Sequence, residues 1–502
     1  MSHSSKLFNT NQTIVAGTIW ITVFVTGSKL LGFVRQLLAG MLFGTSSGYD
    51  AVIIALGPTD LVAGIMAGAF ASVAIPLYLE EKNSNGIESA KSYARGILTF
   101  TSVFLIIFGI TLLIFPAFYV KIFAPGFHGE TLKLAENYLR IYSLLPLLNG
   151  WANLFGAFLR AERMFFQYAV SQFATNIFLI PALLIFAPFM KEGAYALSLE
   201  FGTGAIAFFA YLFGRNIWKT FPFGKISSKQ LLNVLLLASP LFLSSAIATI
   251  NSVVDKAFAS TLEIGSVSAL NYSFTIVSMI NGIIMAGLLT SSLTSISESV
   301  TSMDYKALNQ KTAMIIEAII KILAPITALT IVSSEWIVRI IYQRGQFTQI
   351  STMMTSSALI AYATMIITVP LTTALSNIYI AKKRTLRLTM LGLSMIFINA
   401  YMDWILMMPF KQAGIAASSS IVSFIWVLLL VYDLGFEFKM HNLFSMKTIL
   451  PSILSFFYVI VFLIPFAKIP SIPKLLSEII IALLMVTFFG RKEIKMVFSR
   501  FN

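Results

Sequence analysis

The chain has 502 residues, of which 57% are hydrophobic and 11% are charged, and its formal net charge is +14. A soluble domain carries about a quarter charged residues, so the composition excludes an ordinary soluble protein and indicates a polytopic membrane protein. The absence of cysteine excludes disulfides, thiolate metal sites and cysteine catalysis. Loop cations that set membrane orientation account for the positive charge, and we expect no nucleic-acid partner.

The hydrophobic stretches predict an all-α fold with about fourteen transmembrane helices. The first stretch is too long for a signal-peptide core and carries internal charges, so we expect a retained helix. The predicted spans are 13–43, 50–79, 92–120, 134–160, 165–188, 192–214, 230–258, 268–298, 309–333, 351–380, 385–408, 412–433, 447–467 and 474–490.

Lys and Arg are concentrated in alternate connections between these helices, most densely in 215–229 and 382–387. Because positively charged connections stay on the cytoplasmic side, both termini are predicted to be cytoplasmic.

Similar segments recur in the two halves of the chain at one offset of about 218–221 residues, which indicates an internal repeat. The pairs are 64–76 with 282–295, 121–127 with 339–347, 161–163 with 381–384, and 193–196 with 414–417. Each repeat spans six helices. Because six is an even number, both repeats enter the membrane from the same side and are predicted to be parallel. The last two helices lie outside the repeat. Such folds usually keep a substrate cavity between the halves and work by alternating access.

The predicted domain organisation reflects this repeat. It comprises an N-terminal six-helix repeat at 1–214, a basic cytoplasmic linker at 215–229, a C-terminal six-helix repeat at 230–433, two extra helices at 445–490 and a cytoplasmic tail at 491–502.

Two cations lie inside the first predicted helix, in "GSKLLGFVRQLLAGMLFG" (27–44), with no acidic residue between them. Lys29 lies near the middle of the bilayer, roughly 24 Å along the helix, and no acid stands three or four residues away. Arg35 is nearer the outer surface, about 120° around the helix from Lys29. Cations without a neighbouring acidic residue, if they line a cavity, can bind an anionic substrate such as phosphate or diphosphate.

Acidic residues inside the predicted helices fall into two groups. Asp50 begins the second helix, where a carboxylate either caps free N–H groups or binds substrate, and Asp60 comes after the Gly57–Pro58 break. The pairs Glu136/Arg140 and Glu317/Lys321 are spaced i,i+4 with the acid first, which favours structural ion pairs.

Asp255, Asn399 and Asp403 form a second candidate constellation, to which Ser419 could add an oxygen ligand. Asn399 and Asp403 share a helix face, and two carboxylates with an amide suit Na⁺ or a proton as coupling ion. The alternative is an Asp255–Lys256 neutralisation beside a buried amide–carboxylate hydrogen bond.

The second helix carries two further features. Gly57–Pro58 would kink or break it and supply a hinge, and Gly64 and Gly68, four residues apart, permit close helix contact. The chain has no enzyme signature and no phosphate-cradling loop, so we predict a transporter that is not an enzyme, has no cofactor beyond a coupling ion and is driven by a gradient.

Several segments together resemble the MurJ (MviN) family, within the superfamily of multidrug, oligosaccharidyl-lipid and polysaccharide exporters. The similarity runs over most of the chain up to about residue 430. The matching segments are "SKLLGFVRQLLAGMLFG" (28–44) followed by Asp50, "AGAF" (67–70), "IPLY" (75–78), "APGF" (124–127), "VDKAFASTLEIGSVSALNYS" (254–273), "YQRGQFT" (342–348) and "GIAAS" (414–418).

The resemblance implies a flippase for lipid II, the undecaprenyl-diphosphate-linked precursor of peptidoglycan, in the bacterial cytoplasmic (inner) membrane. It implies fourteen helices, cations that hold the diphosphate and sugar headgroup, and a lipid-tail groove formed by the last two helices, here within 445–490. The partners would be the lipid-linked glycan diphosphate and membrane lipids, and we expect a monomer.

Carried over by position, the resemblance implies substrate-binding roles for Lys29, in place of an arginine, for Arg35 and for Asp50, while Gln36 stands where the family has an aspartate. The Lys29 ammonium keeps the positive charge, but it cannot form the two parallel hydrogen bonds that an arginine guanidinium forms with a carboxylate or phosphate.

Other cationic positions of the family are replaced by Val62, Ala63 and Thr275, and Lys256 is a candidate substitute. These replacements leave open a flippase for an exopolysaccharide or O-antigen lipid-linked repeat unit. A cation-coupled drug antiporter is favoured by Asp255 and Asp403 but opposed by the cations of the first helix. A membrane scaffold without transport would lack an internal cavity.

Overall fold

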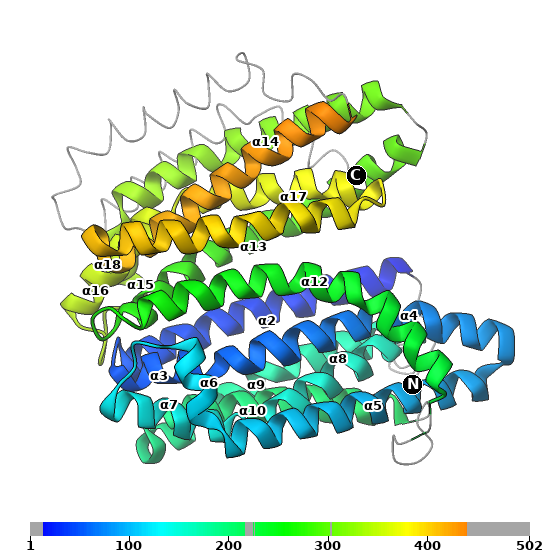
Figure 1. Cartoon of the computed structure of the whole chain (residues 1–502), viewed down its shortest axis with the longest axis horizontal. Helices are drawn as coiled ribbons and strands as arrows, with labels where there is room; N and C mark the ends of the chain where they lie inside the picture. Colours follow the sequence, from blue (N-terminus) through cyan, green and yellow to red (C-terminus); the bar gives the residue numbers. More distant parts are fainter. Residues whose placement is uncertain (1–13, 216–223, 225, 302–303, 439–502) are drawn as a thin grey trace, which may run out of the picture. The chain divides into compact units, whose positions relative to one another are not determined.

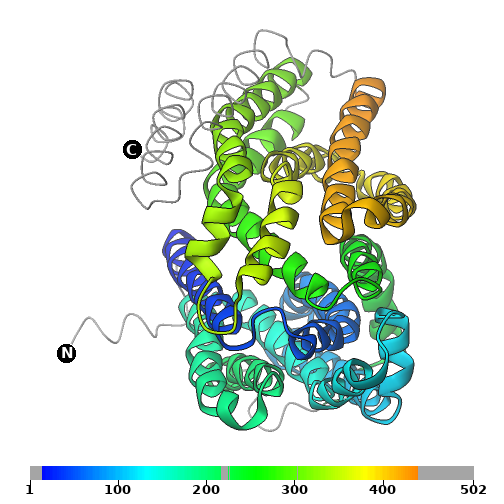
Figure 2. The ribbon, with the colours of Figure 1, turned by 90° about the vertical axis from the view of Figure 1, so that its left-hand side faces the viewer.

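The computed structural model describes residues 14–215, 224, 226–301 and 304–438, and all regular secondary structure in these ranges is helical (Figure 1). The chain divides into two compact units between Ile264 and Gly265. Within each unit the long helices lie side by side in a roughly common direction, which Figure 2 shows nearly end-on. The helices predicted within 445–490 and the tail 491–502 lie outside the described residues.

The first unit contains ten α-helices and one π-helical turn among its described residues. They are α2 (Ile14–Phe43), α3 (Ser47–Thr59), η1 (Asp60–Gly64), α4 (Ile65–Asn85), α5 (Ile87–Ile114), α6 (Pro116–Phe123), α7 (Gly129–Ile141), α8 (Leu145–Ala161), α9 (Phe165–Met190), α10 (Gly193–Phe213) and α12 (Ser228–Ala259).

The second unit contains six α-helical elements among its described residues. They are α13 (Ser266–Thr301), α14 (Tyr305–Val332), α15 (Ser334–Tyr342), α16 (Gln349–Tyr362), α17 (Met365–Ala381) and α18 (Thr385–Phe438). The last is two helices joined at Lys411, whose φ of 52° and ψ of −133° are not helical.

These elements confirm the all-α class, and each of the first twelve predicted spans coincides with one helix or with consecutive shorter ones. Within the described residues, six helices are long and apolar enough to cross a membrane alone, or seven with the bent pair α16 and α17. A total of fourteen spans stays a prediction.

Local side-chain chemistry sets several helix starts. The Ser46 hydroxyl accepts a hydrogen bond from the Tyr49 amide at 3.1 Å and begins α3. Ser227 and Gln230 form a reciprocal capping box at the start of α12. Each cap satisfies amide groups that the first helical turn leaves without a partner.

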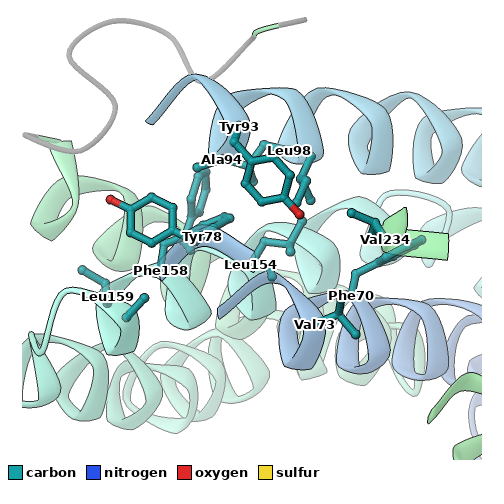
Figure 3. Packing of buried hydrophobic residues seen from close by; sticks show 14 of the residues in the cluster. Phe70, Val73, Tyr78, Tyr93, Ala94, Leu98, Leu154, Phe158, Leu159 and Val234 are labelled. Atoms are coloured by element: carbon teal, nitrogen blue, oxygen red, sulfur yellow. The ribbon is translucent and has the colours of Figure 1, made fainter. Parts of the chain in front are cut away.

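A buried apolar cluster ties α4, α5 and α8 together (Figure 3). Phe158 from α8 packs edge-on against Tyr78 from α4, with ring centroids 5.4 Å apart. Val234 from α12 belongs to the same cluster. Burying large side chains from four helices in one cluster holds these helices as one packed body.

The internal repeat is visible in the backbone. Lys191, between α9 and α10, has φ 50° and ψ −132°, nearly the values of Lys411, 220 positions later. Arg163 and Lys383, also 220 positions apart, share a positive φ of 56° and 57°. Non-glycine residues rarely adopt this conformation, so its recurrence at one offset agrees with the internal repeat predicted from the sequence.

The compact units do not share the boundaries of the sequence repeats. Helix α12 begins the predicted C-terminal repeat, 230–433, yet it packs against α4 and α6 in the first unit. The predicted domain boundaries therefore describe sequence similarity, and they stay a prediction.

Candidate functional site

The middle of the second predicted span is not a plain α-helix. It changes to the π-helical turn η1 directly after α3, two residues beyond Pro58, and the Asp60 amide bonds to both the Leu56 and Gly57 carbonyls. A Cβ atom on Gly57 would lie 2.7 Å from the Phe123 ring, so only glycine allows this approach. Proline disturbs the regular ladder, and π-turns are frequent at functional sites. The hinge role of Gly57 and Pro58 stays a prediction.

This turn brings Asp60 close to two of the predicted substrate-binding cations. The charges of Lys256, on α12, and of Arg35, on α2, both act on the Asp60 carboxylate. The Asp60 side chain is accessible to solvent but lies deep among protein atoms, and Arg35 and Lys256 are half-buried. The first unit thus joins three charges from three separate helical segments.

Arg35 lies beside a hydrogen-bonded aromatic pair. Its guanidinium carbon is 5.9 Å from the centroid of the Tyr195 ring, a cation–π distance. The Gln36 amide donates to the Tyr195 hydroxyl at 3.4 Å and accepts from the Tyr49 hydroxyl at 3.1 Å. The Arg35 Nε is buried and has no hydrogen-bond partner among the described residues. The described chain therefore leaves this donor unsatisfied.

Two further residues of this region were missed from the sequence. Tyr142 is fully buried, its hydroxyl has no partner among the described residues, and it is an electrostatic neighbour of Arg35, Asp60 and Glu200. The Leu144 and Leu145 amides lie near the Glu200 carboxylate, whose buried Oε1 has no hydrogen-bond partner among the described residues. The signal for Glu200 was a lone acid inside the apolar helix α10, a position that usually indicates function.

Lys29 is exposed and has no hydrogen bond or ion pair to any described residue. The adjacent Ser28 faces α9, where its carbonyl accepts from the Asn176 amide at 2.9 Å. Because neighbours on a helix are about 100° apart, Lys29 points away from this packed face. Its ammonium therefore keeps all its donors for an anion or for solvent.

Asp50 is buried in the first turn of α3. Its amide bonds to the Ser46 carbonyl at 3.0 Å, and the capping side chain is that of Ser46. Ser46 is therefore the N-cap of α3, and the substrate role of Asp50 stays a prediction.

The predicted coupling-ion residues are divided between the units. Asp255 lies on α12 in the first unit, and Asn399, Asp403 and Ser419 lie on α18 in the second. Asp403 is fully buried and accepts a hydrogen bond from the Asn399 amide at 3.2 Å. No group of three or more His, Cys, Asp or Glu side chains that could hold a metal occurs among the described residues.

The two predicted structural ion pairs are confirmed. Arg140 and Glu136 approach to 3.9 Å, and Lys321 and Glu317 to 2.5 Å. Gly64 lies in η1, whereas a Cβ atom on Gly68 would meet no atom within 4 Å. Close helix contact, which the glycine spacing favoured, is therefore absent at Gly68 in the structure described.

The fold is shared with solved transporters. A structure described as "Lipid II flippase MurJ, inward closed conformation" matches with a TM-score of 0.79 and 24% identity, covering 95% of this chain and 100% of that one. An inward-facing multidrug resistance MATE family transporter of the MOP superfamily matches with a TM-score of 0.68 and 13% identity, covering 83% of this chain and 96% of that one. The fold is thus that of a membrane transporter.

The sequence comparison is more specific. The profile of the family described as "Lipid II flippase MurJ" matches residues 40–485, and the chain belongs to this family. The "Probable lipid II flippase MurJ" of Buchnera aphidicola subsp. Schizaphis graminum is 27% identical over 474 residues, 91% of each chain. That of Rickettsia prowazekii is 27% identical over 426 residues, 83% of this chain and 82% of its own.

Proposed function

We propose that this chain is a flippase that moves lipid II, the undecaprenyl-diphosphate-linked precursor of peptidoglycan, across the bacterial cytoplasmic membrane by alternating access. The observation that carries the proposal is membership of the lipid II flippase family over residues 40–485. The chemistry of the first unit supports it, because that unit holds cations at membrane-spanning positions that suit a diphosphate.

Arg35 and Lys256 are the groups we expect to bind the diphosphate. The free Arg35 Nε donor and the ammonium of Lys256 can both form charge-assisted hydrogen bonds to phosphate oxygens. Lys29 adds a third cation whose donors are not used within the described chain. The Tyr195 ring, beside the Arg35 guanidinium, limits the orientations of that side chain.

A flippase of this kind makes and breaks no covalent bond, which agrees with a transporter rather than an enzyme. Its partners would be the lipid-linked glycan diphosphate and the surrounding membrane lipids, and we propose that it works as a monomer. The Lys and Arg distribution supports placing both termini in the cytoplasm.

We propose Na⁺ or a proton as the coupling ion, bound at Asp403 and Asn399. Asp403 is fully buried and accepts a hydrogen bond from the Asn399 amide, and a buried carboxylate beside an amide suits a small hard cation or a proton. Ser419, on the same helical element α18, is the further oxygen ligand we propose. The set is made of oxygen donors, which hard cations prefer.

A second candidate is a flippase for another undecaprenyl-diphosphate glycan, such as an exopolysaccharide or O-antigen repeat unit. The observation that favours it is the neutral character of Val62, Ala63 and Thr275. The Thr275 hydroxyl donates to the Asn271 carbonyl at 2.7 Å within its own helix, so it replaces no cation. A less positive site would hold a differently charged headgroup.

The test is a comparison of substrates in proteoliposomes. Fluorescent lipid II, an undecaprenyl-diphosphate oligosaccharide and a cationic drug would be followed across the bilayer in parallel. Transport of lipid II at the highest rate supports the proposal. Transport of the oligosaccharide alone would establish the second candidate, and transport of the drug alone would indicate an antiporter.

A further inference from the structure

We propose that Gln36 is a positioning residue for the arginine beside it, because its amide group fixes the Tyr195 ring and that ring holds the Arg35 guanidinium in one orientation for the diphosphate. The inference rests on the proposed function, in which Arg35 binds the diphosphate of the lipid substrate. It goes beyond that function by assigning a role in substrate affinity to a neutral residue that cannot itself balance the charge of the substrate.

The Gln36 amide joins three helices through two tyrosines. Its Nε2 donates to the Tyr195 hydroxyl at 3.4 Å, and its Oε1 accepts from the Tyr49 hydroxyl at 3.1 Å. Gln36 lies on α2, Tyr49 on α3 and Tyr195 on α10. A glutamine amide carries both a donor and an acceptor, so it can bond one hydroxyl as donor and the other as acceptor. Gln36 therefore holds both phenol oxygens from the position next to Arg35.

Packing restricts the two tyrosine rings. Tyr49 is 0% exposed and Tyr195 is 6% exposed, and their rings meet edge to face with centroids 5.6 Å apart. The Tyr49 ring also stacks on the Phe43 ring at a centroid distance of 5.8 Å. The Ser46 hydroxyl donates to the Glu192 carboxylate at 2.7 Å, which ties the start of α3 to the start of α10. The Tyr195 ring is therefore held by packing along its edge and by Gln36 at its hydroxyl.

This ring is the partner of the Arg35 guanidinium. The guanidinium carbon lies 5.9 Å from the Tyr195 ring centroid, within the range of a cation–π interaction. Arg35 forms no hydrogen bond or ion pair with any described residue, and its Nε is buried. An arginine side chain loses rotamer freedom when it binds an anion, and a guanidinium that is already oriented loses less. Releasing the Tyr195 ring should therefore weaken diphosphate binding although every charge stays in place.

The experiment is a double-mutant cycle on the binding of undecaprenyl diphosphate to the purified full chain in detergent. Gln36→Met keeps the length of the side chain but removes both hydrogen bonds, and it should raise the Kd by about three- to tenfold. Tyr195→Phe keeps the ring but frees it from Gln36, so it should raise the Kd by a similar factor, and the double variant should lose no more than either single one. In an Arg35→Ala background, Gln36→Met should leave the Kd unchanged.

The matched control is Gln412→Met in the second unit. Gln412 is also buried, and its amide donates to the Met354 carbonyl and to the Ser357 hydroxyl, each at 3.4 Å. This variant should bind undecaprenyl diphosphate as the wild type does. Wild-type affinity in Gln36→Met would overturn the proposal, and so would an equal loss of affinity in the Arg35→Ala background or in Gln412→Met. If Gln36→Met does not purify as a folded protein, Tyr195→Phe takes its place in the cycle.

Failure of the proposed function is recognised separately. If the wild type binds undecaprenyl diphosphate no better than neutral undecaprenol, the diphosphate site itself is disproved, and the role of Gln36 falls with it. If the wild type prefers the diphosphate and Gln36→Met binds it equally well, the positioning role alone is overturned.

Discussion

The two units share one backbone plan, and each holds one carboxylate by a cation and a tyrosine hydroxyl. Both bend at a lysine with the same unusual φ and ψ, Lys191 and Lys411. In the first unit, Arg35 and Lys256 lie within electrostatic range of Asp60 but form no ion pair with it. In the second, Asp433 is held by Arg387 at 2.6 Å and by the Tyr379 hydroxyl at 2.7 Å. The first unit has an arrangement like that of Asp433, because Glu162 accepts from Lys82 at 2.8 Å and from the Tyr78 hydroxyl at 2.6 Å. Arg35 and Lys256 differ from these held charges because they form no ion pair within the described residues.

This difference separates groups that build the fold from groups available to a ligand. A carboxylate whose oxygens are occupied by a guanidinium and a phenol contributes to stability and binds nothing else. An arginine with a buried and unbonded Nε has a donor to offer. We therefore expect substitutions at Arg35, Lys256 and Asp60 to alter transport, and those at Asp433 and Arg387 to alter stability.

The largest effect should come from Arg35→Ala. Loss of a charged donor from a desolvated anion site costs about 2–5 kcal/mol, so lipid II flipping should fall about a hundredfold. Arg35→Lys should retain part of the activity, because it keeps the charge but not the fork. Thermal unfolding of both variants should stay near the wild-type value. A variant that loses stability in proportion to activity would assign Arg35 to the fold.

The second prediction compares equivalent bends of the two repeats. A Cβ atom on Gly414 would collide with the Leu406 carbonyl, which is backbone, whereas one on Gly193 would lie 3.1 Å from the Tyr138 ring. Gly414→Ala should therefore destabilise the protein by about 2 kcal/mol, and Gly193→Ala by less than about 1 kcal/mol. Unfolding in denaturant measures both. Equal losses would show that the two bends are packed alike.

The third prediction concerns the ion pair of the second unit. Asp433→Ala should cost about 1.5 kcal/mol of unfolding free energy, below the roughly 3–5 kcal/mol of a fully buried pair, because the Arg387 side chain is 37% exposed. Glu88→Ala is the control, since the Glu88–Lys91 pair lies at the surface and should contribute little. Lipid II flipping by folded Asp433→Ala should be retained, and its loss would contradict a purely structural role for this pair.

The smallest effect is expected for Gly68→Ala. The added methyl group meets no neighbour, so the helix should gain about 0.5–1 kcal/mol from the higher helix propensity of alanine. Transport should not change if Gly68 is only a helical residue. Greater stability together with slower flipping would instead support the hinge role predicted for this part of the second span.

The sequence predicted the long helices well because apolar length and the 220-residue repeat are properties of the chain itself. It did not predict the division of 134–160 into α7 and α8, nor the π-turn at Asp60, because these depend on packing. The backbone near Ser143 shows why, since a Cβ on Gly109 would collide with the Ser143 carbonyl from a separate segment.

The sequence identified candidate site residues individually but not their arrangement in space. Arg35 and Lys256 were identified as charged residues in apolar helices, which can be recognised from the sequence alone. Their proximity to Asp60 was not predictable, because it depends on how three helical segments pack. Tyr142 gave no signal, since a buried tyrosine without a partner has the same sequence appearance as a core tyrosine.

The cations of the first unit are the groups we propose to handle a diphosphate lipid, and flipping of fluorescent lipid II in proteoliposomes by the wild type and Lys29→Ala tests this role most directly. We expect flipping by the wild type, a loss of about tenfold or more in Lys29→Ala, and wild-type behaviour in Lys121→Ala, which removes an exposed lysine from α6. Equal flipping by the wild type and Lys29→Ala would contradict this role.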